Sequence, residues 1–322
     1  MSGPTPQTYD VLIVGGGGAG SSAAQTLVRQ RHTVKVFDTQ KYRFDPSYIL
    51  HGLTAADGLS PKEYISKIHS ELSDYVDYSV SSVEIVKIEK VDTLFQATDK
   101  AGKTYLGRKV ILAQGVSHIF PALEGYEAAW GKGIFHNLFS QGYYANPVTG
   151  HAGVLGMDLM TMPQFTLHLC HLSNQLASAV TIYTNGNTNL TAQLEPSLVN
   201  KPWKTDNRKI KNVALKTAGQ PPMVITFEDG TTVTEDFIGH APISKLNGAD
   251  FAQQLGLEIN QAGDYAIFGP FQETSVKGVY AAGDNMTMFK ALPNAVASGA
   301  QAAAGVAVAL QEEKWGLPPV FG

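Results

Sequence analysis

The chain has 322 residues, of which 43% are hydrophobic and 16% charged, so it is long enough for about two globular domains and too apolar to be disordered. Its net charge of −4 gives no reason to expect nucleic acid or an anionic membrane as a partner. The single cysteine, Cys170, excludes an intrachain disulfide and favours a reducing compartment, which we take to be the cytoplasm.

The chain opens with the pattern of a βαβ unit. Residues 9–14 are typical of a buried strand, residues 18–30 of a helix, and residues 33–37 of a second strand that ends at Asp38. The intervening turn fits the G-x-G-x-x-G pattern of a dinucleotide-binding loop. Asp38 stands where a carboxylate would accept hydrogen bonds from ribose hydroxyls.

Three glycines give that turn its chemistry. Gly15 permits the tight turn, Gly17 lets the backbone approach a pyrophosphate, and Gly20 permits close packing of helix on strand. The helix that follows directs N–H groups and the positive end of its dipole at phosphate oxygens.

The middle of the chain predicts a β-meander and then a second βα unit. The meander covers residues 76–98 and 104–114. The elements expected after it are a strand at 152–155, a helix at 162–176, a strand at 180–183, and a hairpin of 223–227 with 231–237. We therefore predict an α/β fold with two Rossmann-like, three-layer (ββα) nucleotide-binding domains.

A second cofactor signature lies near the C-terminus, where residues 278–284 read Gly-Val-Tyr-Ala-Ala-Gly-Asp. Asp284 can bond the ribityl chain of a flavin, or cap a helix, or do both. Pro293 suits the first turn of a helix over 294–310. That helix is too short and too rich in alanine and glycine to span a membrane.

Taken together, these motifs resemble the low-molecular-weight thioredoxin reductase family, and most of all its fungal dithiol oxidases of the gliotoxin type. Shared stretches beyond the glycine turn include Tyr42-Arg43, 107–112, 133–136, 181–186, 273–276 and Gly283-Asp284. The resemblance implies a homodimeric, thioredoxin reductase-like flavoprotein. Its FAD domain would comprise residues 1–117 and 245–322, and its inserted, degenerate NAD(P)-type domain residues 118–244.

The resemblance also implies which residues hold FAD. The expected set is Gly15, Gly17, Gly18, Ala19, Gly20, Asp38, Thr39, Arg43, His51, Val83, Ala113, Gly115, Gly283, Asp284, Lys290 and Ala291. We expect no metal site, because His151, His168, His171 and His240 show no ligand pattern.

The chain departs from this family at the redox pair. Asn137 and Ser140 occupy the two positions of the family's Cys-x-x-Cys, while His136, Leu138 and Phe139 around them still match. Neither replacement can form a disulfide or a thiolate adduct, so dithiol–disulfide exchange through the protein is excluded.

The nicotinamide-binding turn is also altered. Asp158 takes the place of the second glycine of its fingerprint, where a carboxylate would repel a pyrophosphate. The next strand runs into Thr184-Asn185-Gly186 and lacks the basic pair that thioredoxin reductases use for the 2′-phosphate of NADPH. The resembling fungal oxidases reoxidise their flavin with O2, so we expect NAD(P)H not to bind here.

The position of the missing disulfide is where we expect the substrate. The predicted lining consists of Phe135, His136, Asn137, Phe139, Ser140, Tyr143 and Tyr144. A base must take the substrate's O–H or N–H proton, and His136 and His51 are the candidates. The predicted catalytic residues are His136, His51, Asn137, Ser140 and Tyr144.

The function expected is an FAD-dependent oxidase of a small secondary metabolite that uses O2 and releases H2O2. Alcohol oxidation, amine oxidation and desaturation all remain open. The alternatives are a flavin monooxygenase, an NAD(P)H-dependent reductase, an enzyme that keeps FAD only as a scaffold, and an inactive flavin-binding protein.

Overall fold

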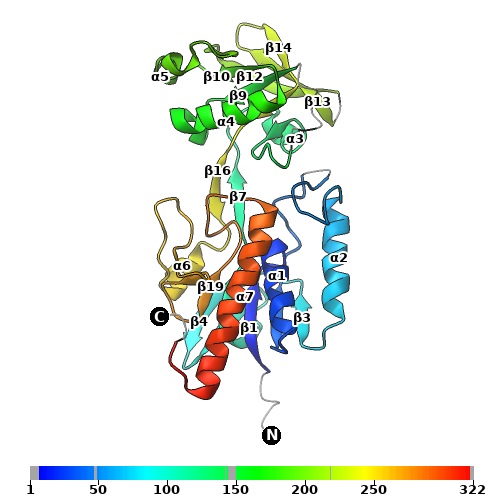
Figure 1. Cartoon of the computed structure of the whole chain (residues 1–322), viewed down its shortest axis with the longest axis vertical. Helices are drawn as coiled ribbons and strands as arrows, with labels where there is room; N and C mark the ends of the chain where they lie inside the picture. Colours follow the sequence, from blue (N-terminus) through cyan, green and yellow to red (C-terminus); the bar gives the residue numbers. More distant parts are fainter. Residues whose placement is uncertain (1–6, 47–48, 142, 144–149, 218, 320–322) are drawn as a thin grey trace. The chain divides into compact units, whose positions relative to one another are not determined.

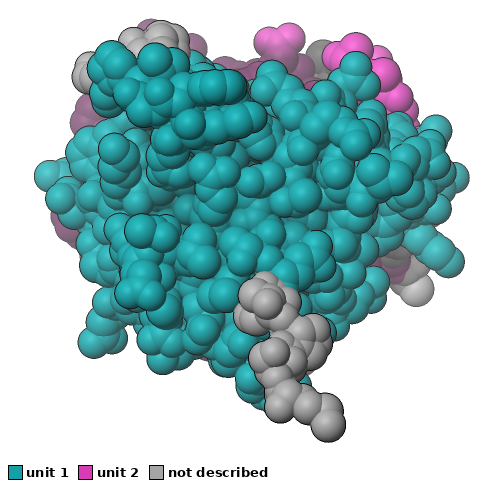
Figure 2. All heavy atoms as spheres, turned by 90° about the horizontal axis from the view of Figure 1, so that it is seen from below, with its two compact units in different colours: residues 1–43, 62–117, 245–322 teal, residues 44–61, 118–244 magenta. Residues whose placement is uncertain are grey.

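The structure, a computed structural model, describes residues 7–46, 49–141, 143, 150–217 and 219–319. The chain forms two compact units, coloured separately in Figure 2. Unit 1 comprises residues 1–43, 62–117 and 245–322, and unit 2 comprises residues 44–61 and 118–244. None of the helices in the described ranges is both long and apolar enough to cross a membrane.

Unit 1 is built on a sheet of nine strands among the described residues. Five neighbouring strands, in the order β19-β6-β1-β2-β3, run parallel, and β4 and β5 extend β6 as an antiparallel meander. The strands are β1 (Thr8–Val14), β2 (Val34–Phe37), β3 (Tyr78–Ser81), β4 (Ile85–Val91), β5 (Leu94–Asp99), β6 (Thr104–Leu112), β17 (Ile267–Phe268), β18 (Glu273–Thr274) and β19 (Val279–Ala281). The helices are α1 (Gly18–Val28), α2 (Pro61–Ser73), α6 (Asp250–Leu255) and α7 (Leu292–Trp315).

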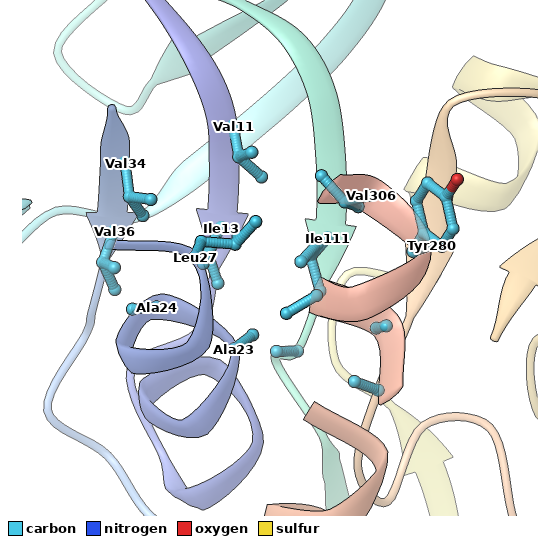
Figure 3. Close-up of a cluster of buried hydrophobic side chains, with 14 of the residues drawn as sticks. Val11, Ile13, Ala23, Ala24, Leu27, Val34, Val36, Ile111, Tyr280 and Val306 are labelled. Atoms are coloured by element: carbon cyan, nitrogen blue, oxygen red, sulfur yellow. The ribbon is translucent and has the colours of Figure 1, made fainter. Parts of the chain in front are cut away.

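The core of unit 1 explains why β1 is apolar on both faces. In Figure 3, Val11 and Ile13 of β1 lie with Ile111 of β6 against the small side chains of α1 and the side chain of Val306 in α7. Leu12 points to the opposite face, into a second core with the meander strands. A parallel strand covered on both sides has to be hydrophobic throughout.

Helices α1 and α7 lie side by side, and glycines permit their close approach (Figure 1). A Cβ on Gly299 would collide with the carbonyl of Ala19, and the Ser22 hydroxyl donates to the Val296 carbonyl at 2.8 Å. A Cβ on Gly18 would lie 2.6 Å from Leu292 Cδ1. The N-terminal ends of the two helices therefore meet.

Unit 2 has a parallel sheet in the order β11-β10-β9-β15-β8 and an antiparallel sheet in the order β12-β13-β14. Its strands are β8 (Ile134–Phe135), β9 (His151–Leu155), β10 (Ala179–Tyr183), β11 (Trp203–Asp206), β12 (Ile210–Thr217), β13 (Gln220–Phe227), β14 (Thr232–Glu235) and β15 (Phe237–Gly239). Its helices are α3 (Tyr126–Ala129), the 3₁₀ helix η1 (Asp158–Thr161), α4 (Pro163–Leu176) and α5 (Thr188–Leu198). The chain passes between the units within β7 (Val116–Ile119) and β16 (Ile243–Leu246).

These elements confirm the predicted α/β fold, including the opening βαβ unit, the second βα unit and the hairpin of β13 with β14. One segment differs from the expectation. Residues 44–61 were assigned to the first domain but group with unit 2. A Cβ on Gly131 would lie 3.2 Å from the Pro46 carbonyl, and one on Gly52 would lie 3.6 Å from Ser140 Oγ. The position of this segment is therefore set by tertiary packing, which the local sequence pattern does not reveal.

We predict that Gly299→Val lowers both stability and flavin content, because the added side chain forces α1 and α7 apart. Overpacking of this kind costs about 1–3 kcal/mol. The melting temperature and the ratio of flavin to protein absorbance measure the two effects. Ala297→Val, on the exposed face of α7, is the matched control and should change neither. Equal behaviour of the two variants would contradict a requirement for close helix approach.

Candidate functional site

The turn after β1 is shaped for a ligand that approaches the backbone. Gly15 has φ +110°, and a Cβ there would collide with the Ala113 carbonyl, while one on Gly20 would collide with Gly15 itself. The Ser21 hydroxyl donates to the Gly16 carbonyl at 2.7 Å and fixes the turn. By contrast, a Cβ on Gly17 would meet only Tyr42 Cδ1, at 3.7 Å, so this backbone position is open to a pyrophosphate.

Two helix N-termini are available to an anion at this turn. Neither α1 nor α7 has a side-chain cap or an acidic residue in its first turn, as far as the described residues show. The first N–H groups of a helix have no partner within the helix, and they carry its positive partial charge. The two N-termini lie close together at Gly18 and Leu292, so both positive helix ends are near the glycine turn.

Asp38 lies at the end of β2, as predicted, and is nearly fully buried. Its Oδ1 accepts a hydrogen bond from the Gln40 amide at 2.9 Å, and its Oδ2 accepts one from the Tyr42 hydroxyl at 2.5 Å. These bonds fix the carboxylate, and each oxygen keeps a second lone pair with which it can accept a ribose hydroxyl. Thr39, next in the chain, is exposed.

Asp284 provides the clearest test of whether this site fits FAD. Its Oδ2 pairs with Arg43 Nε at 2.5 Å, and the Arg43 guanidinium also donates to the Lys290 carbonyl at 2.9 Å. Asp284 Oδ1 is buried and has no hydrogen-bond partner among the described residues. A buried acceptor of this kind is costly unless a ligand supplies a donor, and a ribityl hydroxyl is such a donor.

Lys290 is among the residues predicted to hold FAD, and its side chain is engaged within the protein. Its ammonium donates to the Asp264 carboxylate at 2.9 Å, to the Asp284 carbonyl at 2.8 Å and to the Thr287 carbonyl at 2.7 Å. An ammonium group has three protons, and all three are engaged. Lys290 therefore anchors the loop before α7, and only its main chain remains for the cofactor.

The other residues predicted to hold FAD in unit 1 surround the same strand ends. Ala113 and Gly115 follow β6, and the space beside Gly115 is open. Gly283 follows β19 with φ +88° and donates its N–H to the Ser298 hydroxyl at 2.9 Å. Ala291 precedes α7, while Val83 packs against the second core. Their role toward FAD stays a prediction.

Unit 2 has a different turn at the corresponding place. In unit 1 only residues 15–17 separate strand β1 from helix α1, whereas residues 156–162, including η1, separate β9 from α4. Asp158 adopts φ +50°, and its carboxylate lies 3.8 Å from His240 Nε2. Burial raises the pKa of Asp158. The turn in unit 2 is therefore longer than the glycine turn of unit 1, and it contains η1 and the carboxylate of Asp158.

The polar side chains that follow β10 form hydrogen bonds within the protein. Asn185 Oδ1 accepts from the Ile210 amide at 2.8 Å, and Asn187 Oδ1 accepts from the Leu190 amide at 3.0 Å to cap α5. Beneath η1, the Tyr126 hydroxyl bonds to His240 Nδ1 at 2.6 Å. Burial lowers the pKa of His240 to about 4, so this histidine is neutral and structural.

The segment that replaces the redox pair is a tight turn. Asn137 Oδ1 accepts from the Phe139 amide at 3.0 Å, and the Asn137 carbonyl accepts from the Ser140 and Gln141 amides at 3.3 and 3.0 Å. Asn137 thus shapes the turn and presents Ser140 at its end.

The expected aromatic lining is only partly available. Phe135 is buried and packs against Phe237 in the core of unit 2, and its place in the lining stays a prediction. Phe139 and Tyr143 are 80% and 75% exposed. Tyr144 lies outside the described residues.

The two candidate bases have different surroundings. The His136 ring stacks on Trp130, with centroids 5.4 Å apart, in an aromatic cluster that includes His118. His51 instead pairs through Nδ1 with Asp57 Oδ2 at 3.1 Å. Asp57 was not predicted from the sequence. The Asp57-Gly58 pair is typical of a turn, and such a turn can bring a side chain back toward His51. Which of the two histidines acts as the base stays a prediction.

Cys170 contributes no redox chemistry in this arrangement. It is fully buried in α4, and burial raises its thiol pKa to about 12. A thiol that does not ionise is neither a nucleophile nor a redox partner. Within the described residues, no group of three or more His, Cys, Asp or Glu side chains could hold a metal ion.

Comparison with known proteins gives a consistent picture. Residues 9–141 match the family described as pyridine nucleotide-disulphide oxidoreductase. The chain is 38% identical over 300 residues to thioredoxin reductase tcpT of Claviceps purpurea, with 92% of each chain covered. It is 40% identical over 303 residues to thioredoxin reductase aclD of Aspergillus oryzae, covering 92% of this chain and 95% of that one.

Solved structures agree on the fold. A putative thioredoxin reductase TrxB from Bacillus anthracis superimposes with a TM-score of 0.86 at 25% identity, covering 95% of this chain and 99% of that one. The structure of HlmI gives a TM-score of 0.86 at 23% identity, covering 97% and 96%.

We predict that Asp284→Ala reduces flavin retention. The change removes a charged acceptor, whose hydrogen bond contributes roughly 1.5–3 kcal/mol, and it also leaves Arg43 without its carboxylate. Flavin occupancy after gel filtration should fall, and the melting temperature should fall with it, because a bound ligand stabilises the folded state. Asp74→Ala, at an exposed position, should retain both properties. Full occupancy in Asp284→Ala would show that this carboxylate does not serve FAD.

Proposed function

Because the chain belongs to the pyridine nucleotide-disulphide oxidoreductase family, in its FAD-binding, thioredoxin reductase-like branch, we propose that it is an oxidase that couples oxidation of a small metabolite to reduction of O2. Its electrons would come directly from the substrate. The similarity to fungal relatives is our reason to propose a role in secondary metabolism. The family resemblance separately leads us to propose a homodimer.

One observation carries this proposal: the chain keeps a built flavin site and lacks both usual routes for electrons. Gly17 and Asp284 Oδ1 in unit 1 are open to the cofactor. In unit 2 the altered turn at Asp158 argues against a nicotinamide donor. Asn137 and Ser140 cannot relay electrons as thiols, and Cys170 does not ionise. A substrate that reduces the flavin directly is the simplest remaining source.

When bound, FAD supplies a two-electron acceptor that O2 can reoxidise, so that reduced substrate and O2 become oxidised substrate and H2O2. The chain's own residues would accept the substrate's proton and orient the substrate. His51 would take the proton from the substrate's O–H or N–H, and Ser140 would hold a polar group of the substrate. The paired helix ends of α1 and α7 would hold the pyrophosphate and favour negative charge on the cofactor.

We predict that excess NADPH, mixed anaerobically with the purified holoprotein, leaves the oxidised flavin spectrum unchanged. The reason is that the turn over residues 156–162 does not offer the phosphate site of unit 1. Dithionite, which needs no binding site, is the control and should bleach the flavin. Rapid bleaching at submillimolar NADPH would instead favour a reductase or a monooxygenase.

We predict that the double change Asn137→Cys with Ser140→Cys abolishes substrate-driven flavin reduction while the protein keeps its FAD. A disulfide at these positions would remove the Ser140 hydroxyl and the Asn137 bond that shapes the turn. Stopped-flow absorbance measures the rate, with Cys170→Ala as the matched control for thiol chemistry. An unchanged rate in the double variant would place the substrate elsewhere.

A further inference from the structure

We propose that Asp57 is a positioning residue that holds His51 in the tautomer with its proton on Nδ1, so that Nε2 carries the lone pair that accepts the substrate's proton. This inference rests on the oxidase function proposed above and deepens it. It assigns the base and narrows the substrate to a compound that oxidises with loss of an O–H or N–H proton.

The contacts of the Asp57 carboxylate set the tautomer. Its Oδ1 accepts the Gly52 amide proton at 2.8 Å, and its Oδ2 lies 3.1 Å from His51 Nδ1. The Gly52 hydrogen bond, and then the His51 hydrogen bond, lower the pKa of Asp57, so the group is a carboxylate at neutral pH. A carboxylate only accepts, and therefore His51 Nδ1 must be the donor.

The loop that carries the pair is closed on itself. The Leu50 amide donates to the Leu59 carbonyl at 2.8 Å, and the Gly58 amide donates to the Leu50 carbonyl at 2.9 Å. This closure brings Asp57 back to His51. The His51 side chain is 19% exposed and that of Asp57 57% exposed. A contact between polar side chains at this level of exposure contributes little to stability, so orientation of the imidazole is the effect that the pair can provide.

The pair also lies beside the turn that replaces the redox cysteines. Gly52, with φ +83°, faces Ser140, since a Cβ at this position would stand 3.6 Å from Ser140 Oγ. Residues from two distant parts of the chain thus bring an oriented histidine and a hydroxyl into one region of unit 2. A substrate held by Ser140 would lie within reach of the loop that carries His51.

The chemistry of an imidazole base selects the substrate class. In the oxidation of an alcohol, the carbon loses a hydride, the O–H bond breaks, and a C=O bond forms. The two electrons leave with the hydride to the cofactor and then to O2, and the proton goes to Nε2. An amine reacts in the same way to give an imine. Because imidazole titrates near neutral pH, it assists O–H and N–H protons far better than those of unactivated C–H bonds. Alcohol or amine oxidation is therefore favoured over desaturation.

The Asp57→Asn variant tests the tautomer directly. Its side-chain oxygen can still accept from the Gly52 amide, which leaves the NH2 group facing His51 Nδ1. A donor at this position would drive the histidine to the opposite tautomer, with its proton on Nε2. The loop and the flavin content should be preserved, so the variant isolates the orientation of His51.

The measurement is ¹⁵N–¹H NMR of the histidine-labelled holoprotein, with His51 assigned from the signals that disappear in His51→Gln. We expect the Nδ1–H tautomer in the wild type, the Nε2–H tautomer in Asp57→Asn, and the wild-type pattern in the control Asp74→Asn. If wild-type His51 is mainly the Nε2–H tautomer, or if Asp57→Asn leaves it unchanged, the proposal is wrong.

A kinetic arm separates this inference from the function on which it rests. Benzyl alcohol and benzylamine are the probes, and anaerobic flavin bleaching is the readout. If they bleach the wild type, His51→Gln and Asp57→Asn should slow bleaching by about 10²-fold or more, and Asp57→Glu should restore part of the rate. Bleaching of Asp57→Asn at the wild-type rate overturns the positioning role. If neither these probes nor a wider panel of alcohols and amines bleaches the wild type, the oxidase proposal fails, while the NMR result still decides the role of Asp57.

Discussion

The meeting of two helix N-termini is the constraint on which the rest of unit 1 depends. Gly299 against the Ala19 carbonyl lets α7 lie against α1, and Gly15 and Gly20 let α1 start directly behind β1. The positive ends of both helices then lie close to the glycine turn, where free backbone N–H groups can bind an anion. The buried Asp284 Oδ1 adds an acceptor for the part of the cofactor beyond the phosphates. Cofactor binding is thus a consequence of backbone packing, and side chains refine it.

Unit 2 repeats the parallel architecture but not the short glycine turn of unit 1. Its turn over residues 156–162 is longer, and the carboxylate of Asp158 turns inward toward His240. This unit carries Asn137 and Ser140, which are not thiols, in the turn that follows β8. It retains a shaped turn and, through residues 44–61, a paired histidine.

Local patterns predicted most of the fold, because the G-x-G-x-x-G turn, strand hydrophobicity and the hairpin are encoded within short stretches. The membership in the thioredoxin reductase-like family was also accessible from sequence. Three features were not, since each depends on tertiary contacts. Residues 44–61 group with unit 2 because they pack near Ser140. The Lys290 ammonium donates to carbonyl groups that only the fold brings together. Asp57 contacts His51 because the loop between them closes on itself.

The most direct test of the central claim is the stoichiometry of oxygen use in the absence of any nicotinamide. The purified holoprotein is given a panel of small alcohols and amines, and O2 uptake, H2O2 release and product are measured together. The oxidase account predicts equal molar amounts of O2 consumed, H2O2 released and substrate oxidised, with no oxygen atom from O2 in the product. Oxygen uptake that requires NADPH, or product that carries an atom from labelled O2, would contradict it.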